Sequence, residues 1–188
     1  MNAKVSENEQ YLSASNRITA VIVMVIGVAG QVDIAVEWRT LGGLEVAAVI
    51  ALLMVASYVG LFRPSVTLRP ESLLIRNHVR NHVVPWSMIT EADVTDILRI
   101  HTADRRLRCP GVQLVMRDIR KERAGTRKRK TETSMSRAEF VVGRVDHHID
   151  LYGGKDSADA GIVTTWAVPE LAIAAVLAVV VVVAQLLR

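Results

Sequence analysis

The chain is poor in the residues that build disulfide-bonded or zinc-stabilised folds. Its 188 residues include a single cysteine, Cys109. A disulfide within the chain is therefore excluded, and so is a zinc site with several cysteine ligands. Cys109 stands in Arg108-Cys109-Pro110-Gly111 without a neighbouring histidine. We expect a small buried hydrophobic residue here, not a nucleophile.

Residue groupings that carry common catalytic chemistry are also missing. No glycine-rich phosphate loop appears, and no serine or cysteine is paired with a positioned base. The polar groups that an enzyme could use cluster around one predicted strand: Asp93, Asp96, His101 and Asp104. We therefore expect no enzymatic activity, no catalytic residue and no cofactor.

The few histidines do not form a convincing metal site. His78 and His82 have a four-residue spacing that suits a metal only on a helix, and a turn separates them here. We expect both to face solvent. His147-His148, flanked by aspartates, has metal-compatible chemistry, but adjacent residues of a helix point about 100° apart. We expect no metal ligand.

What the chain has in abundance is long apolar runs, at Ile18–Val32, Val46–Phe62 and Leu171–Leu187. With their flanks they approach the roughly 17–25 residues that cross a hydrocarbon core. Backbone groups inside lipid must be hydrogen-bonded within their own segment, so each run predicts a transmembrane helix. The predicted bounds are 1–17 for an N-terminal segment, 18–36, 45–62 and 167–187 for the helices, and 37–44 for an external loop.

Two alternatives explain these runs less well. A soluble domain of this size has no interior that could hide three helices apolar on every side. A cleaved signal peptide is disfavoured because charged and polar residues are frequent before Arg17 and a second apolar run follows soon after.

Basic residues predict the orientation. The segment from Arg63 to Trp166 carries 19 of the 23 Lys and Arg residues, whereas the short connection between the first two runs has only Arg39. Because basic flanks stay inside, we expect the N-terminus and the central segment to be cytoplasmic and the protein to lie in the inner membrane.

The central segment predicts an α+β domain at 63–153, followed by a linker at 154–166. Alternation at Val66–Arg69, Leu73–Ile75 and Leu98–Thr102 predicts an antiparallel meander, with turn residues between the strands. Two further strands are expected at His82–Trp86 and at Arg106–Cys109, the second pairing back across the Ala103-Asp104-Arg105 turn. Ser136 and Glu139 have capping-box spacing, and Gly153-Gly154 supplies a stop for the helix between them. Its apolar face comprises Val141, Val145, Ile149 and Tyr152, and its expected partners are Leu73, Ile75, Val84, Trp86, Leu98 and Ile100.

The order of short motifs resembles a known family. The motifs are Phe62-Arg63-Pro64, Val66-x-Leu68, Leu73-x-Ile75-Arg76-Asn77, Val84-Pro85-Trp86-Ser87-x-Ile89 and Leu98-x-Ile100-His101-Thr102-Ala103-Asp104. This order resembles bacterial membrane proteins that carry a small pleckstrin-homology-like (PH-like) domain next to a transmembrane hairpin. The resemblance implies a curved antiparallel sheet or partial barrel closed by a C-terminal helix and facing the cytoplasm, and it implies no catalytic residues.

Within that domain Pro85 and Trp86 have structural roles. Proline lacks a donor and ends a ladder, and tryptophan supplies a large apolar area with one N–H to satisfy. We expect Trp86 to be a core anchor, not a ligand platform.

A basic segment at 117–135 interrupts the domain and predicts a mobile loop. Its candidate lipid- or partner-binding residues are Arg117, Arg120, Lys121, Arg123, Arg127, Lys128, Arg129 and Lys130. Binding to an anionic leaflet and a solvated loop without a ligand both remain open. Nucleic acid is not an expected partner, because no aromatic residues are interleaved for stacking.

Together these patterns predict a multi-pass membrane protein with three transmembrane helices and a cytoplasmic α+β domain. We expect a binding or scaffolding module that contacts an unidentified membrane or cytoplasmic protein through the edge or rim of its sheet. Recognition of anionic lipid headgroups by the domain and its basic loop is the alternative, and a membrane-bound enzyme is a weaker one.

Overall fold

The computed structural model describes residues 8–113, 137–154 and 161–187, and these form an α+β protein. They divide into two compact units. We call the first the β-unit (Met1–Ser13, Pro64–Asn77 and Asn81–Thr165) and the second the helical unit (Ala14–Arg63, His78–Arg80 and Trp166–Arg188).

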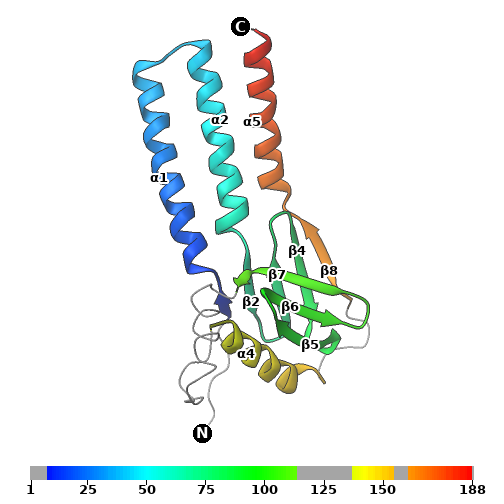
Figure 1. The fold of residues 1–188 in the computed structure, drawn as a ribbon. Helices are drawn as coiled ribbons and strands as arrows, with labels where there is room; N and C mark the ends of the chain where they lie inside the picture. The colour runs from blue at the N-terminus through cyan, green and yellow to red at the C-terminus, as the bar shows by residue number, and fades with distance from the viewer. Residues whose placement is uncertain (1–7, 114–136, 155–160, 188) are drawn as a thin grey trace, which may run out of the picture. The chain divides into compact units, whose positions relative to one another are not determined.

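The helical unit contains three long apolar helices. They are α1 (Ala14–Glu37), α2 (Leu41–Ser57), which continues into a π-helical turn η1 (Tyr58–Phe62), and α5 (Val168–Leu186). Each is long and apolar enough to cross a membrane, with α2 and η1 counted together. In Figure 1, α2 runs between α1 and α5. This architecture is compatible with a multi-pass membrane protein.

The connection between the first two helices is shorter than the loop expected at 37–44. Helix α2 begins at Leu41 because Thr40 caps it: the Thr40 hydroxyl accepts a hydrogen bond from the Gly43 amide at 3.1 Å. Gly43 also lies so close to Trp38 that a Cβ there would meet the Trp38 carbonyl oxygen. The tight turn thus depends on a cap and a glycine.

Several polar side chains in the helical unit are paired across elements. The Gln31 side-chain amide donates to the Ala47 carbonyl at 2.7 Å, which links α1 to α2. Arg63, which follows η1, forms an ion pair with Glu170 in α5 at 2.9 Å and also donates to the His78 carbonyl at 3.2 Å. Arg63 is buried, and a buried cation without a partner would destabilise the protein. The ion pair with Glu170 offsets that cost.

The β-unit is built of two antiparallel sheets that do not close into a barrel, and only Arg80 and Trp166, at the ends of two strands, fall in the helical unit. The larger has the order β1-β2-β3-β4-β8 and the smaller β5-β6-β7. The strands are β1 (Glu9–Tyr11), β2 (Ser65–Leu68), β3 (Ser72–Arg76), β4 (Arg80–Pro85), β5 (Ile89–Val94), β6 (Ile97–Thr102), β7 (Arg106–Gln113) and β8 (Val163–Trp166), with a 3-10 turn η2 (Trp86–Met88) after β4.

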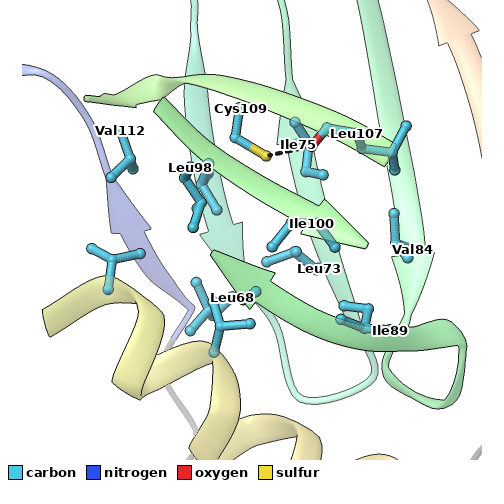
Figure 2. Close-up of a cluster of buried hydrophobic side chains, with 14 of the residues drawn as sticks. Leu68, Leu73, Ile75, Val84, Ile89, Leu98, Ile100, Leu107, Cys109 and Val112 are labelled. Carbon is cyan, nitrogen blue, oxygen red and sulfur yellow. Dashed lines mark hydrogen bonds between the residues drawn. The ribbon is translucent and has the colours of Figure 1, made fainter. Parts of the chain in front are cut away.

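The core of the β-unit lies between the two sheets, as Figure 2 shows. Alternation decides which side chains enter it: in β6, Leu98 and Ile100 are fully buried while Arg99 between them is not. Leu73 and Ile75 of β3 point toward them from the other sheet. Burial of these apolar side chains is the main favourable term for folding.

Helix α4 (Arg137–Tyr152) packs on this core. Val141 and Val145 are fully buried, and Ile149 and Tyr152 pack against the cluster, so the predicted apolar face of the helix is confirmed. All six predicted partners belong to the same cluster. The helix ends before Gly153, whose amide donates to the Ile149 carbonyl at 2.8 Å. Ser136, the expected cap, lies outside the described residues.

Three strands are absent from the sequence-based prediction. β1 lies in the segment expected to be an N-terminal extension, β8 lies in the expected linker, and β5 follows Trp86. The expected antiparallel strands are present, and they form two sheets that do not close into a barrel. Strands β1 and β8 extend the first sheet, and β5 begins the second.

Candidate functional site

The eight basic residues predicted to bind lipid or a partner lie outside the described residues. They are Arg117, Arg120, Lys121, Arg123, Arg127, Lys128, Arg129 and Lys130. Candidate sites on the structure must therefore come from other surfaces of the β-unit.

Pro85 and Trp86 lie in the interior. Trp86 is fully buried and its indole N–H donates to the Arg69 carbonyl at 2.9 Å, so its polar atom is satisfied. Pro85 ends β4 and precedes the 3-10 turn. Both side chains are part of the framework and present no surface to a ligand.

The two histidines of α4 point in different directions. His148 is buried, with Nδ1 2.9 Å from the Arg144 carbonyl oxygen and its ring 5.1 Å from that of Trp86. His147 is exposed, and its ring is nearly perpendicular to that of His148. In the part of the chain that the structure describes, no three potential ligands are grouped for a metal.

His82 corrects another expectation. We expected His78 and His82 to face solvent, and His78 does, but His82 is buried. Its Nδ1 lies 3.0 Å from the hydroxyl oxygen of Thr164 in β8. The expectation was wrong because β8, which the sequence pattern did not indicate, pairs with β4 and covers this side chain.

The groups considered for catalysis are partly brought together. His101 Nε2 lies 3.1 Å from the Asp93 carboxylate on the outer face of the smaller sheet. Cys109 faces the opposite way, into the core, where burial raises the pKa of its thiol. The cysteine therefore stays protonated and away from the His101–Asp93 pair.

Strand β8 forms one edge of the larger sheet, and all four of its residues are exposed. Its inner side is held by β4: Asn81 donates to the Thr165 hydroxyl at 3.4 Å, and the Arg80 guanidinium lies 4.2 Å from the centre of the Trp166 ring. On its outer side no described strand is paired with it. An open edge presents backbone donors and acceptors to a further strand.

The other three sheet edges carry charged side chains, which oppose strand addition. β1 has Glu9, which pairs with Arg144 of α4. β5 has Glu91 and Asp93 and a register shift between Ile89 and Glu91, and β7 carries exposed arginines. The Val-Thr-Thr-Trp sequence of β8 has no charge and no proline. Among the described edges, β8 is the one without such protection.

The link between β1 and α4 is electrostatic as well as apolar. Arg144 Nε donates to the Glu9 carboxylate at 3.0 Å, and Tyr11 donates to the same carboxylate at 2.8 Å. The hydrogen bond from Arg144 holds the pKa of Glu9 below its ordinary value. Burial, followed by the bond to Glu9, raises the pKa of Tyr11 to about 12.

Sequence reasoning missed β8 although a weak signal was present. Val163-Thr164-Thr165-Trp166 is a run of β-branched and aromatic residues, the types enriched in strands, and it ends three residues before Pro169 in the first turn of α5. The run lacks polar–apolar alternation because both of its faces are exposed.

Comparisons of the chain with protein-family models, with curated proteins and with solved structures found no match.

Proposed function

We propose that the chain is a membrane-anchored binding module whose β-unit recognises another protein at the cytoplasmic surface of the inner membrane. The open edge of β8 is the observation that carries this proposal. An extended segment of a partner can pair with such an edge through main-chain hydrogen bonds, a common mode of peptide recognition. The Val163 and Trp166 side chains, more than half exposed, would add apolar contacts to the segment.

Chain connectivity supports placement of the β-unit on one side of the membrane. β1 leads into the start of α1, β2 follows the end of η1, and β8 leads into the start of α5. If each helix crosses the bilayer, these three helix ends are on the same side. The bias of Lys and Arg toward the segment between Arg63 and Trp166 favours the cytoplasm for that side.

We also propose that the β-unit is a PH-like domain of the bacterial membrane type. Two antiparallel sheets enclosing a core on which the C-terminal helix α4 packs support this proposal. Two features would then be variations on that domain: the additional strands β1 and β8, and the division of the strands into a five-stranded and a three-stranded sheet.

A photocrosslinking experiment tests the protein-binding function. A photoreactive residue replaces Val163 in the full-length protein in cells, and a matched variant carries it at Thr90, an exposed position of β5. We expect one discrete crosslinked protein from position 163, and its loss when Thr165 is also changed to Lys, because a charge on the edge opposes strand addition. Equal crosslinking at both positions would contradict the proposal.

The basic segment supports a second candidate, binding to anionic lipid headgroups. Held near an anionic leaflet, each Lys or Arg can contribute about 1 kcal/mol. The test embeds the full-length protein in nanodiscs of neutral lipid and measures cosedimentation with phosphatidylserine vesicles. Lipid binding predicts cosedimentation that is lost when all eight basic residues are changed to Gln. If the Gln variant cosediments as well as the wild type, this candidate fails.

A further inference from the structure

The outer face of the smaller sheet carries an unusual arrangement of cations. Leu98, Ile100, Leu107 and Cys109 point into the core, as Figure 2 shows, so the residues between them face outward. On β6 and β7 these outward residues are Arg99, His101, Arg106 and Arg108. We call Arg99, Arg106 and Arg108 the arginine strip.

The strand register sets like charges opposite one another. Arg99 is opposite Arg108, and His101 is opposite Arg106. Cross-strand pairs on one face lie close together, and like charges directly opposite destabilise a sheet. An anion bound on this face would offset the repulsion.

The carboxylates available on the same face do not pair with the strip. Asp93 is opposite Arg99 in the register, but its carboxylate lies 3.1 Å from His101. Within the described residues Arg99 has no ion pair, and its Nε is buried without a hydrogen-bond partner. The Oδ1 of Asp93 is likewise buried without a hydrogen-bond partner, so this carboxylate does not satisfy Arg99 in the observed arrangement. A buried donor left unpaired is costly, and a bound carboxylate would satisfy it.

We propose that the arginine strip binds an extended acidic segment of a partner protein. Arg106 and Arg108 are two residues apart on one strand, which spaces them by about 7 Å, the spacing of alternate side chains in an extended peptide. All three members are arginines, whose planar forks bind carboxylates through two parallel hydrogen bonds. A segment with Asp or Glu at every second position matches this spacing.

The neighbouring strand distinguishes a narrow ligand from a flat membrane surface. Glu91 and Asp93 of β5 share this face and lie beside β6, about 5 Å from it. An anionic bilayer lying flat on the sheet would be brought against these two carboxylates. A single extended chain over β6 and β7 covers the arginines and avoids them, so charge complementarity favours the acidic peptide.

This inference rests on the proposed protein-binding function but concerns a surface other than the β8 edge. The test uses full-length protein in neutral-lipid nanodiscs and fluorescence anisotropy with two labelled peptides, one alternating Glu and Thr and one alternating Lys and Thr. We expect the wild type to bind the Glu peptide, more weakly as salt is raised, because exposed charges are screened. The double variant Arg106→Glu/Arg108→Glu should bind it about tenfold more weakly or worse.

The charge-reversed double variant should bind the Lys peptide. This gain of function would not arise if the arginines had a purely structural role. A single charge removal in the strip, Arg108→Gln, should weaken binding of the Glu peptide. Its matched control is Arg76→Gln, which removes an exposed arginine of β3 and should leave binding unchanged. Equal binding of the Glu peptide by wild type and double variant, or no binding by either, would overturn the proposal. So would charge-dependent binding to phosphatidylserine vesicles without peptide binding, which would assign the strip to lipid.

Failure of this test is separate from failure of the β8 proposal. The edge variant Thr165→Lys leaves the arginine strip intact, and the strip variants leave β8 intact. Loss of crosslinking at position 163 in the first and loss of peptide binding in the second therefore report on different surfaces.

Discussion

The two units use the same aliphatic residues in opposite ways. In the helical unit Val25 and Ile26 of α1 are 65% and 67% exposed, whereas Val66 and Leu68 of β2 in the β-unit have no exposed surface. The helices thus present apolar side chains outward, and the sheets enclose them. In water the first arrangement would be unfavourable, so the helical unit requires an apolar environment. The β-unit encloses its apolar side chains in its own core and does not need one.

The difference also separates the forces that maintain each unit. Helices satisfy their own backbone hydrogen bonds, so the helical unit needs few long-range polar contacts. The β-unit depends on pairing between distant segments and on exclusion of water from its core. Substitutions that act on one mechanism should leave the other unit unchanged, and four experiments test the comparison.

The largest effect is expected from Trp86→Ala in the core of the β-unit. Removal of a fully buried indole should destabilise this unit by about 3–5 kcal/mol, because a cavity remains. Hydrogen exchange of amides in β3 and β6 should accelerate while amides of α2 stay protected. The control is Trp166→Ala, since that side chain is 54% exposed. Equal effects of the two variants would contradict the assignment of Trp86 to the core.

A lysine on the outside of the helical unit tests what surrounds it. Val176 of α5 is 63% exposed. Facing lipid, Val176→Lys should cost about 2.5–3.5 kcal/mol, whereas facing water it should cost within about 0.5 kcal/mol. Reversible unfolding in detergent micelles measures the cost. Leu151→Lys on α4, where the leucine is 39% exposed, is the matched change in the β-unit. If both lysines cost the same, the membrane interpretation is wrong.

A pair of glycine substitutions separates close packing from helix propensity within the β-unit. A Cβ on Gly111 of β7 would lie 2.7 Å from the Ser65 backbone, so Gly111→Ala should destabilise by about 1–3 kcal/mol. Gly143 of α4 has open space around it, and Gly143→Ala should stabilise by about 0.5–1 kcal/mol. Urea unfolding followed by tryptophan fluorescence measures both. Effects of the same sign would show that the two glycines are not distinguished by their surroundings.

The smallest expected effect is a pH dependence at the β1–α4 contact. Because the pKa of Glu9 is lowered in the folded protein, its contribution is present above the ordinary value near 4.5 and is lost as the pH falls through and below it. The difference in urea midpoint between wild type and Glu9→Gln should therefore shrink from about pH 7 to about pH 3.5. Glu71→Gln, at an exposed turn, is the control. A difference that does not vary with pH would exclude the ionised pair as its source.

Prediction from the sequence succeeded where the signal is local. The three helices follow from apolar runs that leave no other conformation for the backbone in lipid. The face of α4 that carries Val141 and Val145 follows from helical periodicity, and the burial of Leu98 and Ile100 follows from alternation. In each case the pattern lies within a few consecutive turns or residues of one element.

Prediction failed where a neighbour distant in the sequence decides the outcome. β8 has no alternation because it is exposed on both faces, and its strand conformation comes from pairing with β4. The burial of His82 depends on Thr164 of that same strand. β5 is mostly polar and irregular at Ile89/Glu91, so its pattern is weak by itself.

The amino-acid sequence by itself determined that this protein has three helices able to cross a membrane and a β-rich unit with an identifiable core, since hydrophobic patterning acts within each segment. Only the tertiary structure decided which strand stands open at the edge of a sheet and which arginines face each other across β6 and β7. Strand register and order depend on pairing between remote segments, and the two surfaces proposed to bind partners arise from that pairing.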